Sequence, residues 1–280
     1  MSKTSPTVRQ RELGRRLRIL RNEHNLTVED VAEKLLCSAT KISRLETGVR
    51  RASLRDVRDL CTLYGVDELT SAELMSLARG AREQTWWTQY EDLNLDPYLG
   101  LEQDATAITC LTAYHIPALL QTKDYARAVI RTIAPKMDPV IFLQRVEVRM
   151  RRQLVLEMDN RPRYCVLLDE AVLHRRTGGP AIMAAQLDKV LEATRQAKVT
   201  IQVIPFTLGV HAAQDSNFVL LEFKDTAMVF VEGLTANQYI EQPTNIARYR
   251  EALEYLRNSA LSPNDSVQRI ADIRRFYEGK

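Results

Sequence analysis

Hydrophobic positions in the first eighty residues recur at helical spacing. Leu13, Leu17 and Leu20 predict a first helix over about 8–24. Two helices of about two turns each follow between Thr27 and Gly48, joined by a short turn. Their inward positions are Val31, Ala32, Leu35, Ile42 and Leu45, with the turn around Leu36 and Cys37. A fourth helix is expected over 54–64 and a fifth from Thr70 toward Arg82 or beyond, which predicts a five-helix, all-α domain.

Polar residues mark the starts of these helices. A hydroxyl followed three residues later by an acidic residue resembles a capping box, and this pattern occurs three times, at Thr27 with Asp30, Ser53 with Asp56, and Thr70 with Glu73. Ser38 is the expected cap of the third helix. Gly48 supplies the left-handed residue that ends the third helix, and the fourth helix ends at Gly65.

The spacing from Thr27 to Gly48 is that of a helix-turn-helix, so the second of its helices is predicted to enter a DNA major groove. Its outward residues are short, polar or basic: Ala39, Thr40, Lys41, Ser43 and Arg44. We expect Thr40, Lys41 and Arg44 to read bases, with Arg44 binding guanine in bidentate fashion and Lys41 contacting either a base or a phosphate. The candidates for phosphate contacts are Thr27, Ser38, Arg50, Arg51 and Arg55.

From about residue 86 the pattern changes to longer helices alternating with short β-rich runs. Helices are predicted near 100–113, 122–133, 138–158, 181–197, 245–258 and 263–277, with Pro180 and Pro263 in first turns. Strands are predicted at 164–168, 199–204, 218–223 and 228–231. The chain is therefore expected to be multidomain: a helix-turn-helix domain over 1–82 and an α/β or α+β domain with a small sheet over 83–280.

Length and charge support this division. A chain of 280 residues is too long for one small helical module. Residues 1–58 hold 14 Lys and Arg against 7 Asp and Glu, whereas the whole chain holds 39 against 36. The basic excess thus belongs to the N-terminal segment, as expected of a domain that meets phosphates. The polar start and the lack of an apolar run of about 20 residues predict a soluble, cytoplasmic protein without a membrane partner.

Signals for catalysis, metals or cofactors are weak. The four cysteines are far apart and form no CxxC pair, which indicates buried thiols rather than a metal site. Neither G-x-G-x-x-G nor G-x-x-x-x-G-K-[ST] occurs, so no cofactor is expected. Asp169 and Glu170 follow a predicted strand, where catalytic carboxylates are often placed, yet they equally suit a helix start. We do not expect an enzyme.

A ligand pocket in the C-terminal part is a further hypothesis. The segment between Pro205 and Phe218 joins two predicted strands and contains His211, while Trp87, Tyr90 and Tyr114 supply large amphipathic side chains. These four residues are the candidates for lining a pocket that receives a small-molecule effector. The alternative is a hairpin loop with ordinary core aromatics.

The N-terminal segment resembles the Cro and phage-repressor type of helix-turn-helix, the Xre family, through KISRLETG at 41–48 and the basic loop that follows. The resemblance implies a structural ion pair between Arg21 and Glu46. Two positions depart from the family pattern. Val28 stands where relatives often have glutamine, and Leu36 stands where the turn usually has glycine, which costs on the order of 1 kcal/mol if the backbone there is left-handed.

Residues from about Trp87 to Tyr277 resemble the C-terminal domain of actinobacterial Xre regulators, including WhiJ-type developmental regulators. The matching segments are YHIPALLQTKDYARA at 114–128, Arg152-Gln153, IPFTLGVH at 204–211, FVLLEF at 218–223 and FVE at 230–232. The resemblance implies a transcription regulator, in some members antitoxin-like and encoded beside a small partner protein. It implies no ligand residues.

Two functions are therefore open. The first is a regulator that binds double-stranded DNA as a homodimer on an inverted repeat, with the C-terminal domain providing dimerisation and a response to a signal or partner. The alternative is an antitoxin-like interaction protein that binds a small cognate partner and autoregulates its operon.

Overall fold

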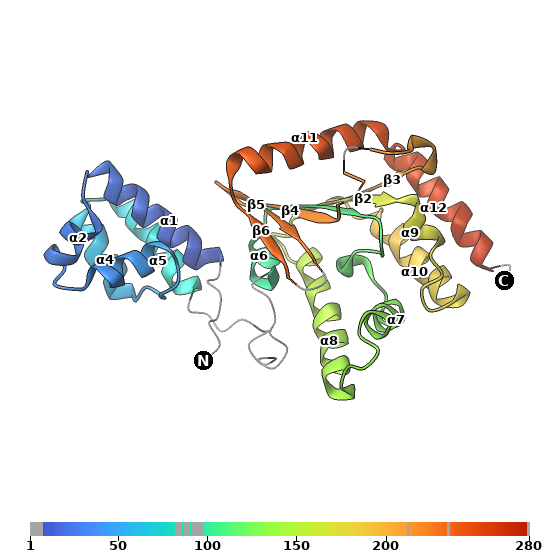
Figure 1. Ribbon diagram of the computed structural model, residues 1–280, viewed down its shortest axis with the longest axis horizontal. Coiled ribbons are helices and arrows are strands. Elements are labelled where there is room, and N and C mark those ends of the chain that lie inside the picture. Colours follow the sequence, from blue (N-terminus) through green and yellow to red (C-terminus); the bar gives the residue numbers. More distant parts are fainter. Residues whose placement is uncertain are drawn as a thin grey trace. The chain divides into compact units, whose positions relative to one another are not determined.

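The computed structural model describes residues 8–81, 86, 90, 98–211, 213–214, 216–233 and 236–278. The chain divides into two compact units, residues 1–101 and 102–280. Figure 1 shows the helices of the first unit and the sheet of the second. Among the described residues, none of the helices is long and apolar enough to cross a membrane.

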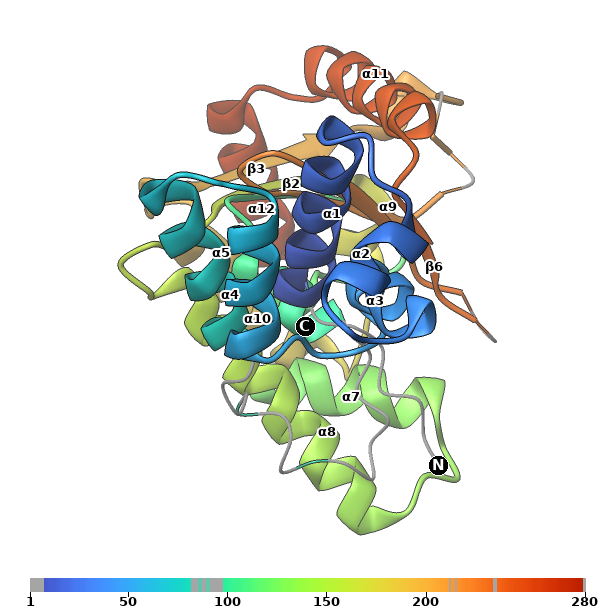
Figure 2. The same cartoon turned by 90° about the vertical axis from the view of Figure 1, so that its left-hand side faces the viewer.

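Residues 8–81 of the first unit are helical, as predicted. The helices are α1 (Val8–Glu23), α2 (Val28–Lys34), α3 (Ala39–Glu46), α4 (Leu54–Leu63) and α5 (Glu68–Gly80). In Figure 2, α1 lies between the α2–α3 pair and the α4–α5 pair. The predicted stripe of α1 packs at the centre of the unit, since Leu13 and Leu17 are fully buried and Leu20 packs against the same core as Ile42 and Leu60. Burial of apolar side chains of this size is the main source of stability for such a bundle.

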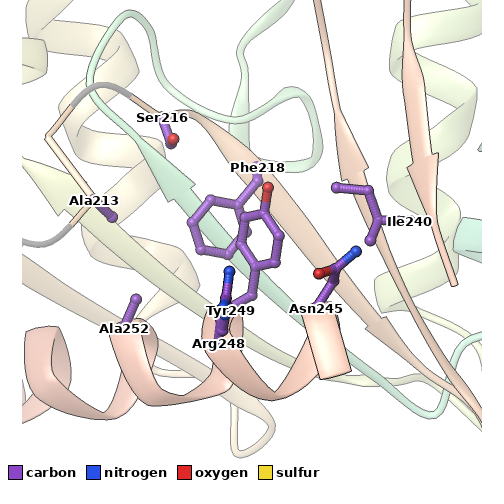
Figure 3. Close-up of a pocket in the computed structure, with 8 residues that line it drawn as sticks. All are labelled: Ala213, Ser216, Phe218, Ile240, Asn245, Arg248, Tyr249 and Ala252. Carbon is purple, nitrogen blue, oxygen red and sulfur yellow. The ribbon is translucent and has the colours of Figure 1, made fainter. Parts of the chain in front are cut away.

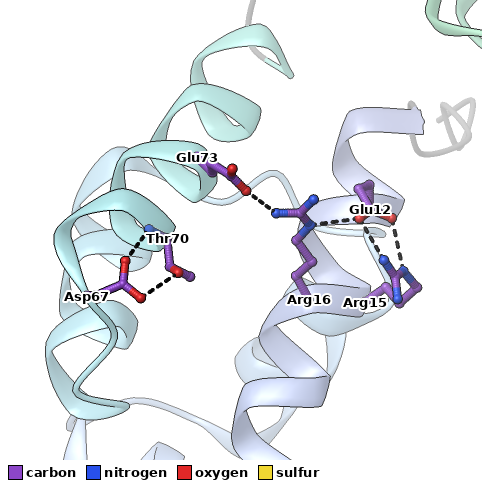
Figure 4. Close-up of polar contacts among 6 residues, drawn as sticks. All are labelled: Glu12, Arg15, Arg16, Asp67, Thr70 and Glu73. Carbon is purple, nitrogen blue, oxygen red and sulfur yellow. Dashed lines mark hydrogen bonds and ion pairs between the residues drawn. The ribbon is translucent and has the colours of Figure 1, made fainter. Parts of the chain in front are cut away.

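Polar contacts join the first and last helices of this bundle, α1 and α5. Arg16 on α1 donates from Nη1 to Glu73 Oε2 on α5 at 2.7 Å and from Nε to Glu12 Oε1 at 2.8 Å (Figure 4). Glu12 also accepts two hydrogen bonds from Arg15. The basic face of α1 is thus partly engaged in contacts within the unit.

The predicted start of the fifth helix was wrong. Asp67, not Thr70, is the N-cap, because its carboxylate accepts a hydrogen bond from the Thr70 amide at 2.7 Å and another from the Thr70 hydroxyl at 3.0 Å (Figure 4). The helix therefore begins at Glu68. Thr70 and Glu73 have the spacing of a capping box, but the carboxylate three residues earlier competes successfully for the same amide.

The second unit is an α/β domain built on a six-stranded mixed sheet, which confirms the predicted fold class. The strands are β1 (Ala107–Thr112), β2 (Arg163–Asp169), β3 (Val199–Ile204), β4 (Phe218–Glu222), β5 (Ala227–Val231) and β6 (Gln238–Ile240). Their order is β3-β2-β1-β4-β5-β6. Strands β1, β2 and β3 are parallel, while β4, β5 and β6 add on antiparallel.

Helices cover both faces of this sheet. They are α7 (Lys123–Ile133), α8 (Pro139–Arg152), α9 (Glu170–His174), α10 (Pro180–Ala193), α11 (Pro243–Ser259) and α12 (Pro263–Glu278), while α6 (Tyr98–Asp104) spans the boundary between the units. In Figure 1, α11 lies over one face of the sheet and α7 to α10 lie on the other. The core under α11 combines Leu253 and Leu256 with Leu111 and Leu220 from the strands. Apart from the cases that follow, the helices and strands predicted from residue 122 onward agree with these elements to within two residues. The helix predicted over 181–197 ends earlier, at Ala193, and α9 was not predicted.

The prediction of a helix over 100–113 was wrong beyond Asp104. Residues 107–112 form the central strand β1, in which all six side chains are buried. A short run that is buried on both faces has no alternation, so its apolar pattern does not distinguish a strand from a helix. The β-branched residues Ile108, Thr109 and Thr112 favour the strand.

The predicted helix over 138–158 also ends early. The α-helix stops at Arg152 and continues as one 3-10 turn, Gln153–Leu156. The Gln153 side-chain amide donates to the carbonyl oxygens of Ala118 and Gln121 at 2.9 and 2.8 Å, and Lys189 Nζ also binds the Gln121 carbonyl, at 2.9 Å. These contacts with distant segments decide where the helix ends. The apolar pattern, which continues through Leu156, gives no information about such contacts.

The segment from Pro205 to Phe218 is not a hairpin loop. Strand β3 is at one edge of the sheet and β4 pairs with β1, so the connection passes the ends of β2 and β1.

The short edge strand β6 was not predicted. It pairs with β5 through only three residue pairs, and a run of this length gives no periodic signal.

Candidate nucleic-acid interface

The helix-turn-helix is held in place by caps at both of its helix starts. The Thr27 hydroxyl accepts the Asp30 amide at 3.1 Å, and Asp30 Oδ2 accepts the Thr27 amide at 2.7 Å, which completes a capping box at α2. Ser38 Oγ accepts the Lys41 amide at 3.2 Å at the start of α3. Thr27 and Ser38 are both exposed. Each of the two predicted phosphate contacts is therefore also an N-cap.

The turn between α2 and α3 contains a left-handed residue. Leu36 has φ 49° and its side chain is 95% exposed, so no packing in this chain compensates for its conformation. The backbone nevertheless closes the turn, because the Leu36 amide donates to the Glu33 carbonyl and the Cys37 amide to the Ala32 carbonyl. The turn therefore closes with leucine at the left-handed position.

Helix α3 presents a polar face opposite its buried face. Ile42 and Leu45 are buried in the core, and Ala39 is half-buried against it. The exposed members of the predicted reading face are Thr40, Ser43 and Arg44. A helix anchored on one side with hydroxyls and a guanidinium on the other can offer hydrogen-bond donors to base edges.

Lys41 is placed differently from the other predicted reading residues. Its ammonium lies 2.5 Å from Oδ1 of Asp56 on α4, and its side chain is 27% exposed. Burial alone raises the pKa of Asp56, but the contacts with Lys41 and Ser53 outweigh it and leave the pKa below its usual value. The lysine of the recognition helix is thus engaged inside the unit, by a carboxylate that the sequence pattern identified only as a capping residue.

An ion pair anchors the end of α3 to α1. Arg21 donates from Nε to Glu46 Oε1 at 2.6 Å and from Nη2 to Oε2 at 3.0 Å, and its Nη1 binds the Leu26 carbonyl at 2.8 Å. The Glu46 side chain is only 4% exposed. The contact with Glu46 raises the pKa of Arg21. This is the pair that the Xre resemblance implies.

Two glycines permit this close packing, and the sequence reasoning missed one of them. A Cβ on Gly14 would lie 2.5 Å from the Glu46 carbonyl oxygen, so only glycine lets α1 approach the end of α3. Glycine inside a predicted helix was the available signal. Gly48, which was predicted to end α3, has φ 71° as expected.

The arginines that follow α3 are exposed. Arg50, Arg51 and Arg55 all lie on the surface, and the Arg50 amide binds the Arg44 carbonyl at 2.9 Å, which fixes the start of the basic loop against α3. Arg55 Nε lies 3.8 Å from Asp59 in a contact that leaves 88% of the Arg55 side chain exposed. These three side chains are available to a polyanion that approaches along α3.

The four pocket candidates do not all belong to the second unit. Trp87 lies outside the described residues, and Tyr90 is a buried residue of the first unit. In the second unit Tyr114 is 60% exposed, and the half-buried His211 accepts the Ala213 amide at 3.4 Å. A hollow of that unit is lined by other residues, from the β3–β4 connection, β4, β6 and α11 (Figure 3).

The two carboxylates after β2 have structural partners. Asp169 caps α9 by accepting the Ala171 amide at 2.8 Å. Glu170 is buried, pairs with Arg269 Nη1 at 2.8 Å and accepts the Phe206 amide at 3.0 Å. Within the part of the chain that the structure describes, no group of three or more His, Cys, Asp or Glu side chains is placed to hold a metal ion.

Comparison with protein families agrees with this geometry. A helix-turn-helix domain model matches residues 12–74, and a domain of unknown function, DUF5753, matches residues 95–272. No curated protein and no solved structure matches the chain. The helix-turn-helix domain indicates a DNA-binding regulator. Because the second match covers more than half of the chain, the protein belongs to the family defined by this domain of unknown function, with a helix-turn-helix domain preceding it.

Proposed function

We propose that this protein is a sequence-specific, Xre-type transcription regulator that reads DNA with α3. The observation that carries the proposal is the exposed face of Thr40, Ser43 and Arg44 on a helix whose opposite side is buried and whose end is held by Arg21 and Glu46. Arg44 binds guanine through its two major-groove acceptors, and Ala39 lies beside the groove floor. The sequence resemblance supports placing the protein among actinobacterial, WhiJ-type regulators.

The basic loop and the start of α4 set the position on the duplex. Arg50, Arg51 and Arg55 bind phosphates, and Thr27 and Ser38 add contacts at the helix starts, where amide groups and the helix dipole favour an anion. The exposure of all three arginines supports this role. Such contacts raise affinity for every sequence and make binding depend on salt.

The test compares two arginines on an operator identified by genome-wide footprinting. Arg44→Ala is expected to weaken operator binding by roughly 1–3 kcal/mol and to relax preference at one base pair, while Arg51→Ala weakens operator and random DNA alike. Arg79→Ala, which removes an exposed arginine of α5, is the control and leaves binding unchanged. Wild-type operator affinity in both Arg44→Ala and Arg51→Ala would rule out this surface.

The protein acts as a homodimer on an inverted repeat. One helix-turn-helix unit covers a half-site, so two copies placed about 10 base pairs apart, or a multiple of that, supply useful specificity. We assign dimerisation to the second unit. Sedimentation equilibrium of the full chain, with and without operator DNA, measures the number of copies. One copy per operator would contradict the assignment.

A second candidate is the antitoxin-like function, in which the second unit binds a small partner protein. It is favoured by three large apolar side chains that are more than half exposed around the connection of α7 and α8: Ile133, Val140 and Leu143. Neighbouring apolar side chains at a surface mark sites of protein contact. Co-expression with the product of the adjacent reading frame, followed by operator titration, tests this. A complex that leaves operator affinity and cell growth unchanged would exclude a regulatory role for that partner.

A further inference from the structure

A hollow of about 450 Å³ lies in the second unit between α11 and the sheet (Figure 3). Its walls come from three separate parts of the chain: Ala213, Ser216 and Phe218 at the end of the β3–β4 connection, Ile240 on β6, and the inward face of α11. Its volume is in the range of sites that hold small organic molecules. It belongs to the second unit alone and does not depend on DNA binding.

The floor of the hollow is apolar and aromatic. Phe218 is 2% exposed and belongs to the core beneath α11, against which Tyr249 and Ile240 also pack. The rings of Phe218 and Tyr249 meet edge to face, with centroids 4.7 Å apart and planes at 67° (Figure 3). The hollow thus opens directly onto core side chains. An occupant with a flat apolar body can pack against this pair in the geometry that aromatic rings prefer.

The rim carries a positive charge that the chain itself leaves unused. Arg248 lines the hollow and is exposed, and among the described residues its guanidinium has neither a hydrogen-bond nor an ion-pair partner. Other arginines of the same helix are engaged: Arg250 pairs with Glu222 at 2.8 Å, and Arg257 donates to Thr109 at 3.0 Å. None of the lining residues is acidic.

Two hydroxyl groups and the Asn245 side-chain amide form the rest of the polar lining of the hollow. Within the described ranges, the Ser216 and Tyr249 hydroxyls have no hydrogen-bond partner, although both residues line the site. The hollow therefore combines an aromatic floor, one planar cation and free hydroxyl donors. A single guanidinium matches the two oxygens of a carboxylate and balances its one negative charge, whereas a phosphate dianion bound there would keep a net negative charge.

We propose that this hollow binds a small aromatic carboxylate. The ring of the ligand packs on Phe218 and Tyr249, its carboxylate forms a bidentate pair with Arg248, and the Ser216 hydroxyl donates to the same group. Neither Tyr114 nor His211 lines this hollow, which gives the domain of unknown function a ligand chemistry that the DNA-reading face does not require.

The test titrates benzoate into the full-length protein and follows binding by saturation-transfer NMR. Wild type and Arg250→Gln are expected to bind benzoate with equal affinity, and Arg248→Gln at least tenfold more weakly. Both substituted arginines are exposed, so thermal unfolding of the two variants should match wild type and exclude misfolding as the cause.

Two further probes separate the charge from the ring. Benzyl alcohol, which lacks the carboxylate, and acetate, which lacks the ring, are each expected to bind at least tenfold more weakly than benzoate. The proposal is overturned if benzoate does not bind at millimolar concentration, if Arg248→Gln binds it like wild type, or if acetate binds as tightly as benzoate. DNA binding is not part of the readout, so failure here leaves the proposed regulator function untouched.

Discussion

Lys41 on α3 and Asp56 on α4 form an ion pair in which Nζ lies 2.5 Å from Oδ1. Asp56 also accepts the Ser53 amide at 2.9 Å, so one carboxylate caps α4 and restrains the recognition helix at the same time. Lys41 was predicted to touch DNA directly. The ion pair instead favours a positioning role, in which Lys41 sets the distance between α3 and the exposed Arg55 on the first turn of α4.

Asp56→Asn is therefore expected to release Lys41 toward the DNA. One additional phosphate contact would steepen the slope of log affinity against log salt by about 0.9 and strengthen binding to random DNA at low salt. Asparagine can still accept the Ser53 amide, so α4 keeps its cap. The measurement is a salt titration by fluorescence anisotropy.

Glu68→Gln is the matched control, because it removes the same charge from an exposed site in the first turn of α5. Its salt slope should stay at the wild-type value. Lys41→Gln in the wild-type background should weaken operator binding less than Arg44→Ala does. An equal loss in these two variants would mean that Lys41 reads bases directly.

The pair of Arg21 and Glu46 should contribute to stability far more than an exposed pair. Glu46→Gln removes the negative charge and leaves the half-buried Arg21 guanidinium uncompensated, at an expected cost of about 3 kcal/mol in the free energy of unfolding. Glu73→Gln acts on the more exposed pair with Arg16 and should cost at most about 1 kcal/mol. Urea unfolding of both variants gives the two values. Equal losses in the free energy of unfolding would show that the burial of Glu46 does not increase the contribution of its ion pair to stability.

The first unit could be predicted well because its signals are local. The inward stripe of Leu13 and Leu17, the capping box at Thr27 and the left-handed Gly48 each depend on residues within a turn or two of one another. The contact of Lys41 with Asp56 could not be predicted. It depends on how closely α3 and α4 approach after the intervening loop, and helical periodicity gives the direction of a side chain but not its partner.

In the second unit, contacts between distant segments limit what can be predicted from the sequence even more strongly. Strand β1 is buried on both faces by helices that lie far along the chain, so its residues carry no alternation. The predicted pocket relied on the type of side chain, as in Tyr114 and His211. The hollow in the structure is instead formed where the β3–β4 connection meets α11, and nothing local in the sequence brings Phe218 and Arg248 to the same site.

Leu36 offers a stabilising substitution. With φ at 49° and a side chain that is 95% exposed, it bears the strain of a left-handed backbone without packing in return. Leu36→Gly should raise the free energy of unfolding by about 1 kcal/mol, because glycine has no Cβ to strain. Leu36→Ala keeps the Cβ and should show no such gain. If both variants lose stability in urea, the Leu36 side chain makes contacts that its exposure conceals.

His115 should make the second unit sensitive to acid. Its ring is half-buried and Nδ1 binds the Ile116 carbonyl at 3.1 Å. Burial lowers the pKa of His115, and the positive charge of Arg149 lowers it further. The hydrogen bond with the Ile116 carbonyl and the negative charge of Glu232 raise the pKa, but the net shift is downward. As pH falls below about 6.5, the unfolded chain therefore takes up this proton before the folded chain does. Stability is retained above that pH and decreases as pH falls toward the lower, folded-state pKa.

His115→Gln, followed by urea unfolding between about pH 7 and 5, should flatten this decrease. A profile as steep as that of wild type would assign the acid sensitivity to other groups.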